Sequence, residues 1–234
     1  MNGVLHVLVV GFPAQAFGTN CFVVAPAPGE QCVVIDPGVG VTAQLDAVLA
    51  EHRLRPVAVL LTHGHLDHTF SVTPVCQARG VSAYIHPRDR EMLADPGKAL
   101  SVDPRTMFGG TFTWAEPDDV KELDDGKVIE LAGLSLTIDH APGHTGGSVM
   151  FQLPTSDEPL LFTGDVLFRD SIGRTDLRGG SMTEMMASLR DKVLTKPDDT
   201  VVLPGHGPET TIGRERAHNP FLREASGTAP HRGL

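Results

Sequence analysis

The sequence has few cysteines and none of them lies in a metal-binding pair. Cys21, Cys32 and Cys76 are the three in 234 residues, and no two form a C-x-x-C motif. Disulfide frameworks and thiolate zinc sites both depend on such closely spaced cysteines. We therefore expect reduced core thiols in a cytoplasmic protein.

The chain also lacks an excess of positive charge and long apolar runs. Lysine and arginine number 19 against 29 acidic residues, a net charge of -10, and no basic cluster is present, so we expect no nucleic-acid partner. The apolar run Val4–Phe12 is interrupted by His6 and Gly11 and follows no basic residue, so we expect no secretion signal. No run approaches the length of a membrane span, so no membrane partner is expected.

Length and composition fit one soluble globular domain of α/β type. Apolar residues make up 41% and charged residues 21% of the 234 positions. We expect a single domain at 1–222 and a polar C-terminal tail at 223–234. In the segment 86–121, polar and isolated apolar residues alternate; Met107–Trp114 could form a flap, and a substrate-selecting lid would lie here.

Hydrophobic periodicity places strands and helices in a repeated order that suits two stacked sheets with helices outside. Predicted strands are Val4–Gly11, Cys21–Ala25, Cys32–Asp36, Val57–Leu61, Val81–Ile85, Val128–Leu131, Leu134–Ile138, Val149–Leu153, Leu160–Phe162 and Thr200–Leu203. Predicted helices are 41–49, one from Asp67 or His68 to about Gln77, Arg88–Leu93 and Met182–Val193.

One stretch, residues 61–68, reads L-T-H-G-H-L-D-H and directly follows an apolar strand. Residues two apart in an extended segment point the same way, so His63 and His65 can bind one ion together. Asp67 and His68 follow after the turn and can face a different point. The spacing suggests two ions side by side.

Three further apolar strands each end in a candidate ligand, namely His144, Asp165 and His206, and a glycine directly precedes each one. Sites gather at strand ends, so we expect one cleft to collect all seven side chains. Seven ligands suit two ions that share a carboxylate. Imidazole and carboxylate ligands favour two divalent ions per chain, zinc first, with iron or manganese as alternatives. Water between two ions about 3.5–4 Å apart becomes a nucleophile near neutral pH.

The ligand motif and the order of the later ligands resemble the metallo-β-lactamase superfamily over nearly the whole chain. The resemblance implies an αββα sandwich, two mixed β-sheets flanked by helices, with a dinuclear site at one sheet edge. It also implies how the ligands divide: His63, His65 and His144 on the first metal, Asp67, His68 and His206 on the second, and Asp165 between them. We predict Asp67, His68 and Asp165 as the catalytic residues.

Within that family, the motif I-G-R-T-D-L at Ile172–Leu177 and the ending Ile212–Leu222 resemble small single-domain glyoxalase II-like hydrolases, which are hydroxyacylglutathione hydrolase-like. This resemblance implies attack of a metal-bridging hydroxide on a small-molecule thioester of the S-2-hydroxyacyl-thiol type. Arg174 matches a substrate-binding basic residue, although a surface ion pair with Asp170 or Asp176 explains it equally well. Gly207 stands where the family has a substrate-contacting tyrosine, and no counterpart of its C-terminal extension follows, so the thiol carrier stays open.

Several other activities stay open at this point. A persulfide dioxygenase of the same superfamily would use one iron on His63, His144 and Asp165, and a complete second ligand set argues against it. A lactonase or phosphodiesterase is also compatible with the motifs. A β-lactamase is disfavoured because its second metal is typically bound by a thiolate. The chain could be a monomer or a homodimer.

Overall fold

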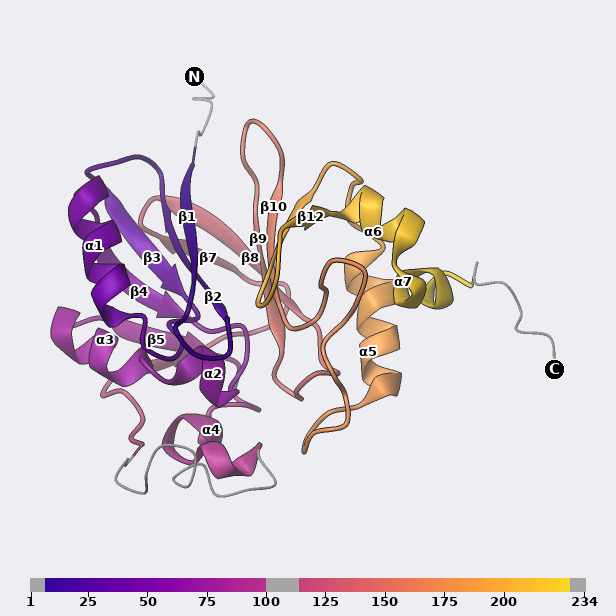
Figure 1. The fold of residues 1–234 in the computed structure, drawn as a ribbon, viewed down its shortest axis with the longest axis horizontal. Helices are drawn as coiled ribbons and strands as arrows, with labels where there is room; N and C mark the ends of the chain where they lie inside the picture. The colour runs from indigo at the N-terminus through magenta and orange to yellow at the C-terminus, as the bar shows by residue number, and fades with distance from the viewer. Residues whose placement is uncertain (1–6, 100–113, 228–234) are drawn as a thin grey trace.

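Two mixed β-sheets lie face to face in the computed structural model, which describes residues 7–99 and 114–227 (Figure 1). The first sheet has the order β1 (Leu8–Pro13), β2 (Asn20–Ala25), β3 (Gln31–Ile35), β4 (Arg55–Leu60), β5 (Ser82–Ile85) and β6 (Val120–Glu122). The second has the order β12 (Thr210–Thr211), β11 (Val201–Pro204), β10 (Leu160–Gly164), β9 (Val149–Leu153), β8 (Leu134–His140) and β7 (Val128–Leu131). Each sheet combines parallel and antiparallel pairs.

Helices cover the outer face of each sheet. On the side of the first sheet lie α1 (Thr42–His52), α2 (Leu66–Thr69), α3 (Val72–Arg79), α4 (Glu91–Ala94) and the 3₁₀ turn η1 (Pro96–Lys98). On the side of the second lie α5 (Met182–Ser188), the π-helical turn η3 (Leu189–Val193), α6 (Ile212–His218) and α7 (Pro220–Ala225). The predicted αββα sandwich is therefore confirmed. No helix among the described residues is both long and apolar enough to cross a lipid bilayer.

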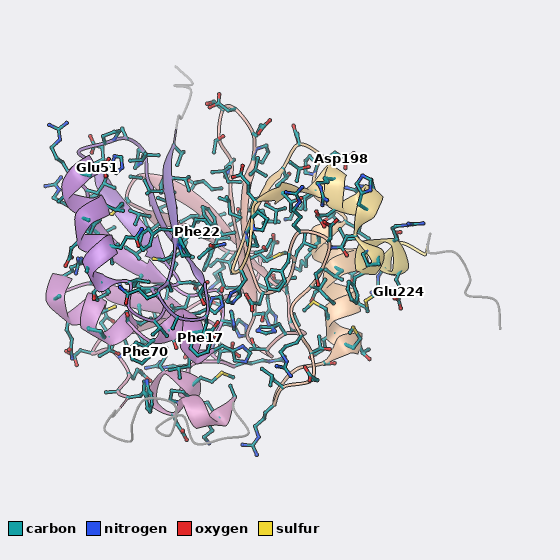
Figure 2. All side chains as sticks on the ribbon, in the orientation of Figure 1. Phe17, Phe22, Glu51, Phe70, Asp198 and Glu224 are labelled. Carbon is teal, nitrogen blue, oxygen red and sulfur yellow. The ribbon has the colours of Figure 1, made fainter. Side chains whose placement is uncertain are left out.

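The layers follow from the alternation of side chains along each strand. Successive strand residues point to opposite faces, so Val23 packs under the helices of the first sheet while Val24 faces the second sheet. In the same way Met150 packs against the outer helices and Phe151 lies between the sheets. Phe151 is fully buried, and truncating such a side chain to alanine costs about 3–5 kcal/mol. Figure 2 shows the side chains that fill these layers.

The predicted strands lie close to the observed ones, and their shared turns have the expected geometry. Between β7 and β8, Ala132 and Gly133 both have positive φ, at 54° and 73°, as a two-residue hairpin turn requires. The helix predicted for Met182–Val193 is present as α5 continued by η3, and Met185 is fully buried whereas Met182 is exposed. The last helix, α7, continues past position 223, where the tail was expected to begin, to Ala225.

The single helix predicted from 67 or 68 to about 77 is wrong, because the chain forms α2 and α3 with a break between them. At the break, the backbone N–H of Ser71 donates to the Pro37 carbonyl at 3.0 Å and its hydroxyl donates to the Gly38 carbonyl at 2.6 Å. These bonds to a distant loop replace the helical ones, so the axis restarts at Val72. The helix predicted at Arg88–Leu93 begins later, as α4. Most of the predicted flap at 107–114 lies outside the described residues.

Candidate metal centre

The carboxyl ends of four strands converge at one edge of the sandwich. Strand β4 leads into the His63–His68 stretch, β8 into His144, β10 into Asp165 and β11 into His206. Strands β8, β10 and β11 run in the same direction within the second sheet, so their ends reach the same edge. The end of β4 in the first sheet lies opposite these three strand ends of the second sheet, so the predicted ligands meet between the two sheets.

All seven predicted ligands lie within one compact cluster. Its ligand atoms form three groups, each within 4.8 Å: His63 with His65 and His144, His63 with His68 and Asp165, and Asp67 with His68 and His206. Asp165 lies between the two ends, with one oxygen 3.3 Å from the Nε2 of His68 and the other 3.4 Å from the Nε2 of His144. The structure thus brings all seven residues together, and their division between two ions stays a prediction.

Buried polar atoms without partners provide an independent test of whether metal ions fit. Within the described residues, the Nε2 atoms of His63, His65 and His144 and one oxygen of Asp165 are buried and form no hydrogen bond. A buried polar atom without a partner costs about 1–3 kcal/mol, so four in one cluster are unfavourable unless a ligand satisfies them. The three imidazoles form one ligand group and Asp165 belongs to the adjoining group with His63 and His68, so divalent cations bound in these groups would satisfy all four atoms. The donor set, imidazole and carboxylate without thiolate, suits zinc, iron or manganese.

The carboxyls of the cluster are ionised and the imidazoles of His63 and His65 are neutral, the forms that bind metals, whereas the nearby carboxylates outweigh burial and raise the pKa of His68 and His206. Burial, and then the neighbouring imidazoles, lower the pKa of His63 well below its usual value and that of His65 to about 3. Both rings therefore offer a free lone pair. For Asp67 and Asp165, burial raises the pKa, but nearby imidazoles, that of His68 first, outweigh it and hold both carboxyls below their usual values.

Asp36, at the end of β3, positions the histidine at the centre of the cluster. Its carboxylate accepts hydrogen bonds from the Thr62 backbone N–H at 2.8 Å, from the Thr62 hydroxyl at 2.6 Å and from the Nδ1 of His68 at 2.9 Å. Its backbone has a left-handed φ of 50°, a conformation that Asp tolerates better than most residues. With Nδ1 holding the proton, the Nε2 of His68 can point its lone pair at a metal.

Asp89 connects the two loops that carry His63, His65 and His144. Its buried carboxylate accepts from the Gly64 N–H at 2.9 Å, the Gly147 N–H at 2.8 Å and the Thr145 hydroxyl at 2.6 Å. Gly64 separates His63 from His65, and Thr145 directly follows His144. Asp89 therefore fixes the relative position of both loops.

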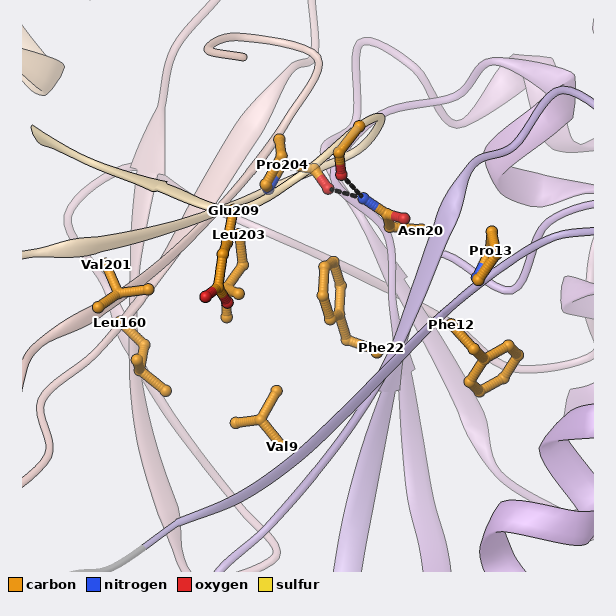
Figure 3. A pocket seen from close by; sticks show the side chains of 12 residues that line it. Val9, Phe12, Pro13, Asn20, Phe22, Leu160, Val201, Leu203, Pro204 and Glu209 are labelled. Carbon is orange, nitrogen blue, oxygen red and sulfur yellow. Dashed lines mark hydrogen bonds between the residues drawn. The ribbon is translucent and has the colours of Figure 1, made fainter. Parts of the chain in front are cut away.

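Loop residues from the first sheet hold the other end of the cluster. The Thr19 hydroxyl donates to Asp67 at 3.0 Å, and the Asn20 amide donates to the carbonyls of Pro204 and Gly207, each at 2.9 Å (Figure 3). These bonds tie β2 to the loop of His206. Asn20 also lines a cavity of about 380 Å³ between the sheet edges, walled by apolar side chains that include Phe22 and Leu203.

Glycine is required where the loops pass closest to the ligands. A Cβ on Gly205 would lie 2.3 Å from an Asp165 oxygen and 2.7 Å from the Cε1 of His68. A Cβ on Gly143 would collide with the Met185 backbone, and its φ is 144°. Close packing therefore requires glycine directly before the ligand at both positions.

Arg174 lies beside the cluster, but its side chain points into a surface ion pair. The guanidinium forms two bonds with the Asp176 carboxylate, at 2.7 and 2.8 Å, and both groups are exposed. Its backbone carbonyl, however, accepts from the Nδ1 of His144 at 2.7 Å and fixes that ring. The substrate-binding role of Arg174 stays a prediction, and the contact through its carbonyl was not foreseen.

Comparison with known families agrees with this geometry. The model of the metallo-β-lactamase superfamily matches residues 14–206, which include every ligand of the cluster. The chain belongs to the metallo-β-lactamase superfamily. A relative from Mycobacterium tuberculosis, described as an uncharacterized protein, is 49% identical over 94% of this chain and 99% of its own. The hydroxyacylglutathione hydrolase GloC of Haemophilus influenzae is 35% identical over 92% of this chain and 97% of its own.

Solved structures of superfamily members superpose on nearly the whole chain. The B3 metallo-β-lactamase BLEG-1 is similar with a TM-score of 0.80 and 38% identity, covering 92% of this chain and 99% of that one. TTHA1623, solved in a di-iron-bound form, is similar with a TM-score of 0.75 and 35% identity, covering 91% of this chain and 100% of that one. These solved structures share the superfamily fold with this chain, and they do not establish which metal its cluster binds.

Two carboxylates that position the ligands, Asp36 and Asp89, were missed from sequence. Asp36 follows an apolar run just as the ligands do, so the same signal could have found it, but it was assigned only as the last residue of the predicted strand Cys32–Asp36. Asp89 lies in a polar segment without periodicity, and no sequence pattern marks it. Its role depends on two loops, at 64 and at 145–147, that meet only in the folded chain.

Proposed function

We propose that this protein is a dinuclear metal-dependent hydrolase that cleaves thioesters of the S-2-hydroxyacyl-thiol type. The observation that carries the proposal is the pair of ligand sets around Asp165, with four buried polar atoms that no group of the described chain satisfies. The 35% identity to a hydroxyacylglutathione hydrolase along nearly the full length of both chains supports the choice of thioesters.

Seven side chains would hold the two metal ions. One ion would be held by His63, His65 and His144. The other would be held by Asp67, His68 and His206, and Asp165 would bind both. Two such ions, when bound, supply a water molecule that loses its proton near neutral pH and a Lewis acid for the acyl carbonyl.

The chain's own groups set the protonation and access of the site. Asp36 keeps the proton of His68 on Nδ1, and the Arg174 carbonyl does the same for His144. His206 and Asp67 are the more accessible members of the cluster, at 28% and 24% side-chain exposure. A thiolate is a good leaving group, so the site needs no buried general acid beside it.

The test combines metal content with two activity assays on the same sample. We expect elemental analysis of protein purified without added metal to give two ions per chain, and S-lactoyl thioesters to be hydrolysed. His206→Ala should reduce the metal content toward one and the rate by at least about 100-fold. Lys127→Ala, an exposed substitution in the β6–β7 turn, serves as the control. One iron per chain with oxygen uptake on a persulfide would overturn the proposal in favour of a dioxygenase.

A second candidate is β-lactam hydrolysis, which the sequence disfavoured. The specific observation in its favour is the 38% identity to a structure described as a B3 metallo-β-lactamase. A chromogenic cephalosporin assayed beside the thioester decides between them by the ratio of kcat/KM values. A ratio in favour of the cephalosporin would replace the thioesterase proposal.

A further inference from the structure

A second cavity, of about 480 Å³, lies beside the metal cluster between α4 and the loop that precedes α5. Its lining includes the three cations Arg88, Lys98 and Arg178, the two acids Asp89 and Glu91, and Gly146. The volume is within the range of small-molecule sites, about 300–1,000 Å³. We refer to it as the arginine pocket.

Two of the three cations in the arginine pocket have no counter-ion among the described residues. Arg88 and Arg178 form no ion pair within residues 7–99 and 114–227, whereas Lys98 lies 3.5 Å from Glu91. Elsewhere on this acidic surface the arginines are commonly paired, as Arg174 is with Asp176 four positions before Arg178. Two exposed guanidinium groups that face one cavity, and that are unpaired in the described part of the chain, leave a local positive field in a chain of net charge -10.

The acids of the arginine pocket offset that field only in part, since two guanidinium groups face the single carboxylate of Asp89 once Lys98 is paired with Glu91. Glu91 already pairs with Lys98. Asp89 is fully buried beneath the pocket, and its carboxylate accepts from the Gly64 and Gly147 N–H groups and the Thr145 hydroxyl. The guanidinium groups therefore remain available to an anionic ligand, which they can bind with paired N–H donors.

The arginine pocket is connected to the loops that carry the metal ligands, in part by short distance in sequence and in part by hydrogen bonds. Gly146 is two residues after His144, and the stem of Arg88 lies against it, since a Cβ there would be 3.7 Å from the Arg88 Cδ. Asp89 in the floor bonds to the backbone between His63 and His65. Arg178 belongs to the loop whose residue 174 carbonyl holds the His144 ring. The arginine pocket therefore adjoins both loops that carry His63, His65 and His144.

We propose that the arginine pocket binds an anionic group, a carboxylate or a phosphate, on the thiol portion of the substrate, with Arg88 and Arg178 as its specificity-determining residues. This inference rests on the thioesterase function proposed above. It places recognition of the thiol on the α4 side of the site and not on Arg174.

The test uses three thioesters with the same lactoyl group on different thiols. Glutathione carries carboxylates, coenzyme A carries phosphates, and N-acetylcysteamine carries no charge. For metal-loaded protein with both Arg88→Ala and Arg178→Ala, we expect kcat/KM on one or both anionic thioesters to fall about tenfold, the size expected when two solvent-accessible ion pairs are lost. The loss should be in KM, and the neutral thioester should change less than about twofold.

Arg55→Ala is the matched control, because Arg55 is an exposed arginine at the opposite end of β4 from the cluster. A Lys replacement at positions 88 and 178 should recover part of the lost KM. The anionic thioester that responds identifies the group: glutathione for carboxylate, coenzyme A for phosphate. Equal changes on charged and neutral thioesters, or none on either charged one, would refute the pocket's role while leaving the thioesterase function standing.

If the metal-loaded wild type hydrolyses none of the three thioesters, the thioesterase function fails, and the arginine pocket is decided separately. Phenylglyoxal labelling, mapped by mass spectrometry, should then modify Arg88 and Arg178 more slowly in the presence of glutathione or coenzyme A, with Arg55 unaffected. Equal labelling with and without these thiols would refute the pocket as an anion site.

Discussion

Replacing Asp36 by Asn should remove one metal ion without unfolding the protein. Asp36 is 1% exposed, and its carboxylate only accepts, from the Thr62 N–H and hydroxyl and from the Nδ1 of His68. An amide keeps the size but turns one oxygen into a donor. Asn also tolerates the φ of 50° at this position, so the backbone is not the cause of any effect.

The expected loss in affinity for the second metal ion follows from the two orientations that the introduced amide can adopt. If its NH₂ faces His68, the imidazole proton must move to Nε2, where it blocks the lone pair that would bind metal. If its NH₂ faces the Thr62 N–H, two buried donors oppose each other, at a cost of about 1–3 kcal/mol. We expect affinity for the second ion to fall about 10–100-fold, as for other lost partners of metal-binding histidines.

The assay is competition with a graded series of chelators, followed by elemental analysis. The wild type should hold two ions and Asp36→Asn one, with unchanged far-ultraviolet circular dichroism. Asp46→Asn is the control, because that carboxylate is exposed and pairs only with Arg79. Two ions of unchanged affinity in Asp36→Asn would show that the Asp36 carboxylate does not fix the His68 tautomer, and the reasoning would be refuted.

Three further outcomes follow from the same structure. Gly205→Ala should lose metal and at least about 100-fold in activity, because its Cβ would lie 2.3 Å from an Asp165 oxygen. In the native protein, Cys32 and Cys76 should resist alkylation at pH 8, because burial raises the pKa of each thiol to about 12. Burial and then His140 lower the pKa of His86 from 6.5 to about 4, so the free energy of unfolding should decline, by at most about 3 kcal/mol from this group, as pH falls from 6.5 to 4.

Each of these has a measurement that can contradict it. Gly146→Ala is the control for metal content, since its Cβ meets only an ordinary contact at 3.7 Å, and full metal in Gly205→Ala would be contrary to the packing argument. Mass spectrometry that finds the two thiols alkylated within minutes, without denaturant, would contradict their burial. For His86, urea titrations of wild type and His86→Phe between pH 4 and 7 should diverge at low pH, because only the imidazole gains a proton on unfolding; parallel curves would count against the lowered pKa.

Local sequence was sufficient to predict an element where its apolar residues form a regular pattern, and to predict a ligand where it directly follows a strand. Alternation of apolar residues placed β8 and a short apolar run placed β9 within a few residues, because a strand buried on one face needs the first pattern and a strand buried on both faces the second. It failed at Ser71, where a hydrogen bond to the Pro37 carbonyl divides one predicted helix into two. Periodicity reports which face of an element is buried, and it carries no information about bonds to a loop more than 30 residues away.

The sequence by itself determined the sandwich class and which seven side chains could bind metal, because imidazole and carboxylate at strand ends have a chemistry independent of their surroundings. Only the tertiary structure decided which tautomers are held, through Asp36 and the Arg174 carbonyl, and which arginine has no ion pair among the described residues. Arg174 and Arg178 lie in one loop and look alike in sequence; the first meets the Asp176 carboxylate and the second faces a cavity. Sequence allowed Arg174 to pair with either Asp170 or Asp176, and the conformation of the folded loop decides between them.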